Sequence, residues 1–175
     1  MEQLNCRLQI KTVTEAGTFV GLASVFSNVD LGGDVVAPGA FTRTLQAKGN
    51  EVPVLYQHDL RQPIGLGRLT ETHAGLQIEG QLVLSVTKAR EAYDLMKANV
   101  LKGLSIGYDT IKFNIKDGVR HLTELKLFEV SLVTIPMNEL ATVSAVKSNR
   151  PLAASSILEL QELIKNSRKI WSCNG

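Results

Sequence analysis

The hydrophobic period of the chain changes at Lys102-Gly103-Leu104-Ser105-Ile106-Gly107-Tyr108, where one small hydroxyl lies between apolar and glycine neighbours. Before this stretch, residues 87–101 carry apolar side chains at helical spacing, and Gly103 stands where a C-cap glycine would end a helix. After it, residues 109–115 alternate between apolar and polar types, which predicts a half-buried strand. The apolar face of that strand consists of Ile111, Phe113 and Ile115. Ser105 is therefore expected near the start of a strand that follows a helix.

The pattern Gly103-x-Ser105-x-Gly107 matches the nucleophile elbow of α/β-hydrolases, which needs a strand, a sharp turn and then a helix. The order of elements is the opposite here, so the sequence argues against that fold. Two glycines that relieve crowding around a space-filling serine are the commoner explanation of such a short motif. A chemical role for Ser105 therefore depends on what the fold places beside it.

Length and composition are those of an ordinary soluble protein with one main domain. The chain has 175 residues, of which 44% are hydrophobic and 21% charged, and its formal net charge is +2. A core of this size needs no metal or cofactor for stability. The sequence has neither the basic stripe nor the aromatic ladder of nucleic-acid-binding proteins, so no nucleic-acid partner is expected.

The cysteines and the apolar runs bear on the compartment. Cys6 and Cys173 are too few and too far apart in sequence for a disulfide framework or a zinc site, which indicates a reducing, intracellular environment. No apolar run approaches the roughly 18 residues of a membrane helix, and the first residues lack the pattern of a signal peptide. We expect a cytosolic protein without a membrane partner.

The remaining elements follow from local patterns. Alternation in 4–10 and 18–26 predicts an opening β-hairpin. The loop 27–34 has two aspartates but lacks the further oxygen ligands of a calcium loop, and residues 40–48 predict a short helix. Further strands are expected at 53–59, 64–70 and 76–84, and an Asp117-Gly118 hairpin turn should join 108–116 to a strand from 119 onward.

The amino-acid composition changes near the end of the sequence. Residues 148–155 are small, polar and interrupted by proline, which is typical of a linker. A capping box at Ser156 then opens an amphipathic helix. The chain therefore divides into a main domain at 1–147 and a linker with a C-terminal helix at 148–175.

Two residues stand out on the predicted strands. Glu129 interrupts an apolar series and would point inward, where an unpaired carboxylate costs several kcal/mol. Its partner could be an Arg or Lys in a structural ion pair, or a catalytic group. His58 ends a strand on the face of Val54 and Tyr56, where a structural histidine is the commoner outcome. His73 lies in a turn and is expected to be solvated.

His58, Ser105 and Glu129 together have the chemistry of a serine hydrolase. A serine hydroxyl becomes a good nucleophile when an imidazole takes its proton, and a third group can orient that imidazole. The chain order of histidine, serine and acid differs from the serine, acid and histidine order of α/β-hydrolases. These three residues are the candidate catalytic site.

At this point the sequence resembles the prohead (capsid maturation) protease family of tailed bacteriophages over residues 4–147. The resemblance rests on six blocks in the same order: Gly21-Leu22-Ala23-Ser24-Val25-Phe26, Asp30 to Asp34 with Pro38-Gly39-Ala40-Phe41, Leu55-Tyr56-Gln57-His58-Asp59, Pro63-Ile64-Gly65, Gly103-Leu104-Ser105-Ile106-Gly107-Tyr108, and Glu129-Val130-Ser131-Leu132-Val133 with Pro136.

The resemblance implies a mainly β fold with flanking helices, an antiparallel β-barrel similar to the herpesvirus assembly proteases. It implies that His58 is the base and Ser105 the nucleophile of a serine endopeptidase without cofactor or metal. The implied substrates are the major capsid protein, its scaffold region and the chain itself, cut inside the immature capsid in the host cell cytoplasm. Self-association into a homo-oligomer is left open.

The family pattern leaves the third catalytic residue and the oxyanion donors open. Herpesvirus enzymes use a second histidine, which falls after the serine at about the place where Glu129 lies in this sequence. Glu129 is therefore our choice for the third catalytic residue, and His121 is the reserve. The paired arginines that help those enzymes stabilise the oxyanion have no match here, because Met137 and Asn138 follow Pro136. Backbone N–H groups are the default donors.

The alternative function belongs to another class. The same β domain could be a non-catalytic capsid-assembly or scaffold-binding module, in which the three residues have structural roles only.

Overall fold

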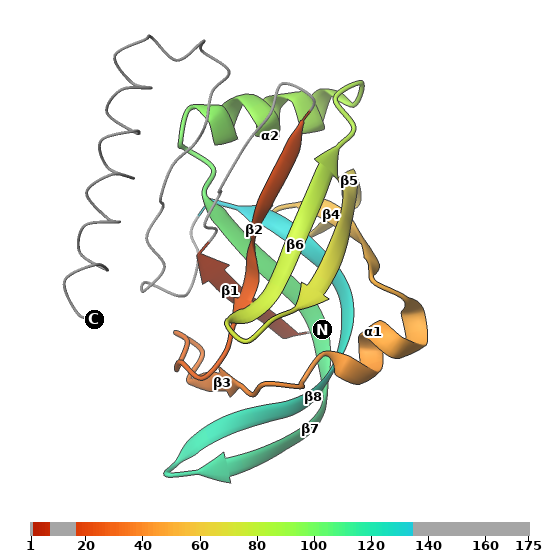
Figure 1. Cartoon of the computed structure of the whole chain (residues 1–175). Helices are drawn as coiled ribbons and strands as arrows, with labels where there is room; N and C mark the ends of the chain where they lie inside the picture. The colour runs from red at the N-terminus through yellow and green to blue at the C-terminus, as the bar shows by residue number, and fades with distance from the viewer. Residues whose placement is uncertain (1, 8–16, 135–175) are drawn as a thin grey trace, which may run out of the picture.

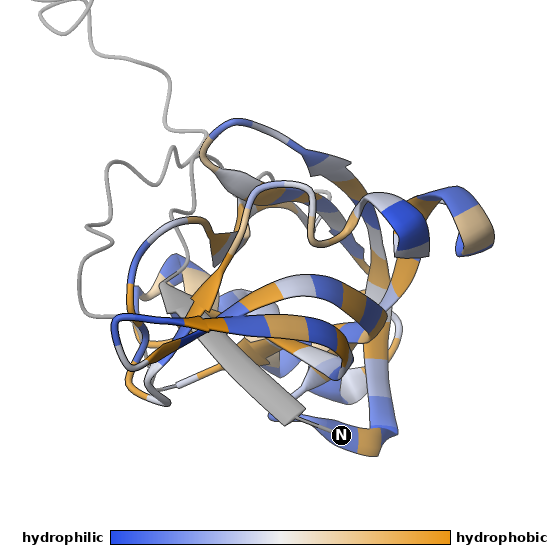
Figure 2. Ribbon diagram, turned by 90° about the horizontal axis from the view of Figure 1, so that it is seen from below, coloured by the Kyte–Doolittle hydropathy of each residue, from blue (hydrophilic) through white to orange (hydrophobic). Residues whose placement is uncertain are grey.

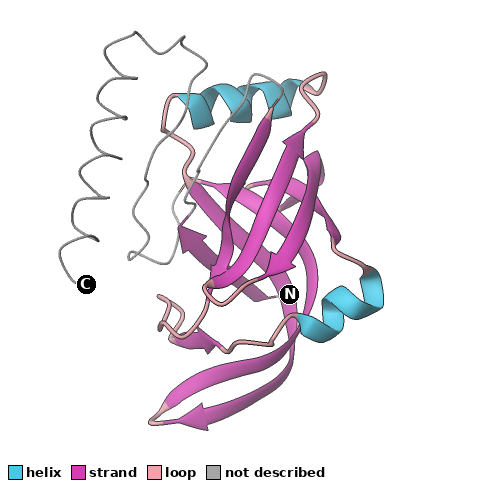
Figure 3. Ribbon diagram, viewed as in Figure 1, coloured by secondary structure: helices cyan, strands magenta, loops and turns pink. Residues whose placement is uncertain are grey.

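The structure, a computed structural model, describes residues 2–7 and 17–134. Strands dominate this part of the chain and two short helices flank them (Figures 1 and 3). The elements are β1 (Glu2–Arg7), β2 (Thr18–Val25), β3 (Asp34–Val36), α1 (Thr42–Lys48), β4 (Glu51–Tyr56), β5 (Asp59–Glu71), β6 (Gly75–Leu82), α2 (Thr87–Lys97), β7 (Gly103–Lys116) and β8 (Val119–Val133). The expected fold class, mainly β with flanking helices, is confirmed.

The strands form one curled sheet in the order β1-β7-β8-β4-β5-β6-β2, and β3 pairs separately with β8. Most neighbours are antiparallel, but β8 pairs in parallel with β3 and with β4. The curl brings β1 and β2, from the two ends of the order, close together in space (Figure 1). β8 therefore has three strand neighbours, and it lies between β7, which carries Ser105, and β4, which leads to His58.

The core fills the inside of the curl. Apolar and polar residues alternate along the strands, as Figure 2 shows by the alternation of orange and blue. Phe19 of β2 and Ile78 of β6 are buried, and α2 contributes Ala89 and Met96, which are fully buried. The amphipathic stripe predicted for 87–101 therefore packs on the sheet as expected for its first three turns.

The predicted opening hairpin is wrong. β1 pairs with β7 and β2 pairs with β6, so the described parts of the two segments do not pair with each other as a hairpin. An alternating pattern shows that a strand has one apolar face, but it does not select the neighbouring strand.

The predicted helix end at Gly103 is also wrong. α2 ends at Lys97, Asn99 takes the left-handed conformation with φ of 63°, and Gly103 begins β7. Asparagine is one of the few non-glycine residues that adopt this conformation readily. Val100 was expected on the buried stripe, but it lies after the helix and is 55% exposed.

The distal part of the β7–β8 hairpin differs from the expected half-buried strand. The hairpin extends beyond the rest of the sheet (Figure 1), and its apolar side chains are exposed by 51%, 53% and 70% at Ile111, Phe113 and Ile115. Alternation predicted the strand correctly, but within residues 2–7 and 17–134 no layer covers its apolar face. The hairpin turn is confirmed, since Lys116 pairs with Val119 across Asp117-Gly118.

In the loop 27–34, a side-chain ion pair engages one of the two aspartates. Arg120 Nε donates to Asp34 Oδ1 at 2.7 Å, and Asp30 Oδ1 accepts from the Asp34 backbone N–H at 2.9 Å. Burial raises the pKa of Asp30. Within 2–7 and 17–134 no three His, Cys, Asp or Glu side chains cluster as metal ligands would.

The predicted linker at 148–155, the helix after it and the boundary at residue 147 lie outside the described residues. Among the helices that the structure describes, none is long and apolar enough to cross a membrane.

Candidate active site

A tight turn between β4 and β5 presents His58. Tyr56 pairs with Asp59, and the two residues between them, Gln57 and His58, have φ of 54° and 59°. Positive φ at both positions is the pattern of a type I′ turn, which suits glycine and asparagine better than these residues. Two hydrogen bonds to β8 hold the turn: Gln57 N–H donates to the Leu132 carbonyl at 3.0 Å, and His58 N–H donates to Ser131 Oγ at 3.1 Å.

Antiparallel pairing of β7 with β8 places the serine and the carboxylate. Ser105 lies opposite Ser131 and Gly107 lies opposite Glu129. Ser105 is the third residue of β7, near the start of the strand as predicted. Since β4 joins β8 on its other side, the turn that carries His58 comes to the same place.

The three candidate residues meet in one hydrogen-bonded chain. His58 Nε2 is 2.6 Å from Ser105 Oγ, and His58 Nδ1 is 2.6 Å from Glu129 Oε1. These partners assign the tautomer, because the carboxylate can only accept: Nδ1–H donates to Glu129, and Nε2 accepts from the serine hydroxyl. Glu129 thus has an imidazole as its partner, where the sequence had also allowed an Arg or Lys.

The site is buried, and a low local dielectric strengthens its electrostatic interactions. Ser105 is fully buried, Glu129 is 1% exposed, and the His58 side chain is 10% exposed. A carboxylate this deep is expensive unless all its oxygens are satisfied. Oε2 of Glu129 accepts a hydrogen bond from Ser131 Oγ at 2.7 Å, so both oxygens have donors.

Gly107 has a specific reason to be glycine. A Cβ built on it would lie 2.9 Å from Cγ and 3.0 Å from Cδ of Glu129, closer than real side chains approach. The missing side chain therefore makes the space in which Glu129 crosses its partner strand. This accounts for the second glycine of the Gly-x-Ser-x-Gly pattern without a nucleophile elbow.

The neighbouring carboxylate, Asp59, is engaged elsewhere. It accepts from the backbone N–H and from Nε of Arg61 at 2.9 Å and 3.1 Å. Side-chain hydrogen bonding to Arg61 lowers the pKa of Asp59. The acid next to His58 in sequence is therefore not the one that contacts the imidazole.

The other two histidines lie away from this site. His121 is on β8 opposite Asn114, eight residues before Glu129, roughly 26 Å away at the usual rise of a strand. His73 lies between β5 and β6 and is exposed, as expected for a turn residue. The structure brings together His58, Ser105 and Glu129 and leaves His121 apart.

Sequence reasoning missed the contacts of Ser131. The sequence placed this serine only within the block Glu129-Val130-Ser131-Leu132-Val133, whereas in the structure it is hydrogen-bonded to both Glu129 and the His58 backbone. The available signal was a small hydroxyl two residues after an inward carboxylate, and therefore on the same face of the strand. The residues after Pro136, where the oxyanion arginines would fall, lie outside the described part of the chain.

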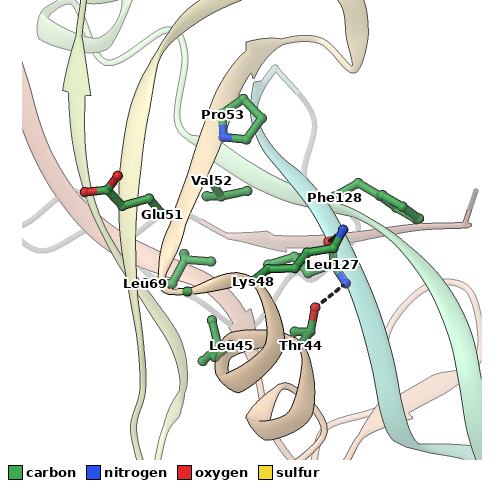
Figure 4. Close-up of a pocket in the computed structure, with 10 residues that line it drawn as sticks. Thr44, Leu45, Lys48, Glu51, Val52, Pro53, Leu69, Leu127 and Phe128 are labelled. Carbon is green, nitrogen blue, oxygen red and sulfur yellow. Dashed lines mark hydrogen bonds between the residues drawn. The ribbon is translucent and has the colours of Figure 1, made fainter.

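A cavity of about 210 Å³ lies beside the site strand but does not include the three residues (Figure 4). Residues of α1, β4, β5 and β8 line it, among them Leu69 and Phe128. Thr44 Oγ1 accepts from the Leu127 backbone N–H at 3.1 Å, as the dashed line shows. The cavity belongs to the packing of α1.

Comparison with known proteins gives consistent relatives. The family model of the caudovirus prohead serine protease matches residues 6–154. The chain is 34% identical to the prohead protease of Enterobacteria phage HK97 over 137 residues, which are 75% of this chain and 61% of that protein. It is 34% identical to the prohead protease of Escherichia phage T5 over 134 residues, 73% of this chain and 62% of that protein. The chain therefore spans about three fifths of the length of these relatives.

A solved structure supports the fold. The capsid assembly protease gp21 of bacteriophage T4 superimposes with a TM-score of 0.59, covering 77% of this chain and 97% of that one at 11% identity. At 11% sequence identity, this similarity is evidence for the fold only.

Proposed function

The chain belongs to the caudovirus prohead serine protease family, and from this premise we propose that it is a serine endopeptidase with His58, Ser105 and Glu129 as its catalytic residues. The family resemblance seen in the sequence is thereby confirmed, while the activity and its residues are our proposal. The observation that carries it is the continuous hydrogen-bonded chain Ser105–His58–Glu129, with 2.6 Å at each link.

The proposed reaction is acyl transfer in two steps. Ser105 Oγ attacks the carbonyl carbon of a peptide bond while His58 Nε2 takes the hydroxyl proton. The C–N bond then breaks, and His58 returns the proton to the leaving amine. Water, deprotonated by His58, attacks the acyl-enzyme ester and releases Ser105. Glu129 orients Nδ1–H and stabilises the imidazolium.

We propose that the substrates are the phage major capsid protein and its scaffold region, cleaved inside the immature capsid in the host cell cytoplasm. Three of the relatives support this role by name, two as prohead proteases and one, from Pseudomonas phage PAJU2, as a capsid polyprotein. Backbone N–H groups are proposed as the oxyanion donors.

The direct test is cleavage of co-expressed capsid protein, followed on gels. Ser105→Ala should reduce cleavage by about 10⁴-fold or more, the scale of nucleophile loss in a serine protease. Capsid assembly without any cleavage, equally efficient with wild type and Ser105→Ala, would instead favour a scaffold-binding module.

A further inference from the structure

Ser131 makes two buried contacts, both to groups of the proposed catalytic site. Its hydroxyl donates to Glu129 Oε2 at 2.7 Å and accepts from the His58 backbone N–H at 3.1 Å. The side chain is fully buried. A hydroxyl has one proton to donate, and the backbone N–H can only donate, so these two bonds fix its orientation completely.

These bonds close a ring around the imidazole. Glu129 Oε1 accepts from His58 Nδ1–H, Glu129 Oε2 accepts from Ser131, and Ser131 accepts from the backbone of His58 itself. The carboxylate therefore cannot rotate about its last bond without losing one of its donors. The turn cannot relax from its positive φ values without losing the hydrogen bond from the His58 backbone N–H to Ser131 Oγ.

We propose that Ser131 is the positioning residue of the site: it holds the Glu129 carboxylate and the His58 backbone at once, and so sets the direction in which the imidazole faces Ser105. The inference rests on the proposed function. The imidazole nitrogen that would act as base contacts Ser105 Oγ, whereas the Ser131 hydroxyl contacts the Glu129 carboxylate and the His58 backbone, so Ser105 is the serine that faces the base.

Replacing Ser131 by Ala removes the hydroxyl with little change in volume. Glu129 Oε2 and the His58 N–H lose these partners in a buried site, so Glu129 and His58 should become misaligned. We expect kcat to fall about ten- to a hundredfold, the scale for losing a hydrogen bond to a buried charged group, with KM nearly unchanged. Ser131→Thr keeps the hydroxyl and should recover most of the rate.

Ser24 supplies a matched control. It is fully buried on β2, and its hydroxyl has no hydrogen-bond partner among the described residues. Ser24→Ala therefore changes a buried serine to alanine without removing a contact to the site. The Ser24→Ala protein should be labelled by a fluorophosphonate at the wild-type rate.

Two readouts test the proposal: the rate at which a fluorophosphonate labels the protein, and the position of the His58 Nδ1–H proton resonance in NMR spectra. The second needs no activity, and the chain has only 3 histidines to assign. Ser131→Ala should label slowly and move this resonance upfield, because the bond to Glu129 weakens. Ser24→Ala should change neither.

The proposal is overturned if Ser131→Ala keeps the wild-type labelling rate and resonance, or if Ser24→Ala slows labelling as much. Should Ser131→Ala not fold, Ser131→Cys fills similar space with a weak donor and must show the same upfield move. If wild type never labels, the proposed function fails, while the resonance still decides whether Ser131 positions Glu129 and His58.

Discussion

At the scale of single residues, the site depends on a backbone conformation that is unfavourable for the residues that adopt it. Gln57 and His58 both have positive φ, which costs of order 1–3 kcal/mol per residue and persists only where the surrounding structure enforces it. Here the backbone N–H groups of Gln57 and His58 donate hydrogen bonds to acceptors on β8, and these two bonds hold the conformation of the turn. Glycine or asparagine would adopt the same turn with less strain. The strained residues are therefore consistent with the proposed role of His58 in this turn.

Glu129→Gln tests the proposed role of Glu129 as the third catalytic residue. The amide keeps the shape but loses the charge that favours the imidazolium, so cleavage should fall by up to about 10⁴-fold while the fold survives. His121→Ala is the matched control and should be silent, because His121 lies eight residues away along β8. A silent Glu129→Gln combined with an inactive His121→Ala would replace the acid by a second histidine.

Gly107→Ala tests the space that Glu129 occupies. The new methyl group would collide with the Glu129 side chain, so the free energy of unfolding should fall by about 1–3 kcal/mol, as for other overpacked sites. In a Glu129→Ala background the same change should cost much less. Urea denaturation of the four proteins measures both values, and equal costs in the two backgrounds would contradict the collision.

At the scale of elements, α1 covers an edge of β8. Between its pairing with β3 and its pairing with β4, β8 has no strand on this side within the described residues. Three positions four residues apart supply the missing partners: the Ala40 carbonyl accepts from Leu125 N–H at 2.9 Å, Thr44 Oγ1 accepts from Leu127 N–H, and Lys48 Nζ donates to the Leu127 carbonyl at 3.5 Å. The helix thus replaces a strand next to Glu129.

Thr44→Val tests this cover (Figure 4). Valine has the same shape but leaves the buried Leu127 N–H without an acceptor, which should lower the free energy of unfolding by about 1–3 kcal/mol. Thr123→Val, at an exposed position of β8, should stay within about 0.5 kcal/mol of wild type. Equal effects in urea denaturation would mean that the Thr44 hydroxyl contributes nothing specific.

Sequence patterns predicted elements better than they predicted partners. The Asp117-Gly118 turn and the inward face of Glu129 were predictable because both depend on local geometry. The pairing of β1 with β7 and the exposed hairpin beyond Ile111 were not, since both depend on which distant strands come to cover a face. The contacts of Ser131 were missed for the same reason, because one of them crosses from β8 to the β4–β5 turn.

At the scale of the whole molecule, the parallel pairing of β4 with β8 brings the candidate site together. It joins the turn bearing His58 to the hairpin bearing Ser105 and Glu129, residues separated by up to 71 positions in sequence. The three residues could be selected from the sequence by chemistry and by resemblance. Their approach to within 2.6 Å could not, because it needs the order of strands in the sheet.

The segment after residue 147 gives a prediction for the full chain. The sequence of 148–155 suits an extended linker, and such segments are favoured cleavage sites. We expect the protease to remove its own tail there, so that wild type shortens with time while Ser105→Ala stays at full length. Mass spectrometry of both proteins decides, and a wild-type chain that stays intact while it cleaves capsid protein would rule out self-removal.

The central claim is that His58 activates Ser105, and covalent labelling by a fluorophosphonate tests it most directly. Intact mass and peptide mapping should show one adduct, on Ser105, in wild type, none in Ser105→Ala and very slow formation in His58→Ala. A folded wild-type protein that forms no adduct, or forms it on Ser131, would contradict the account.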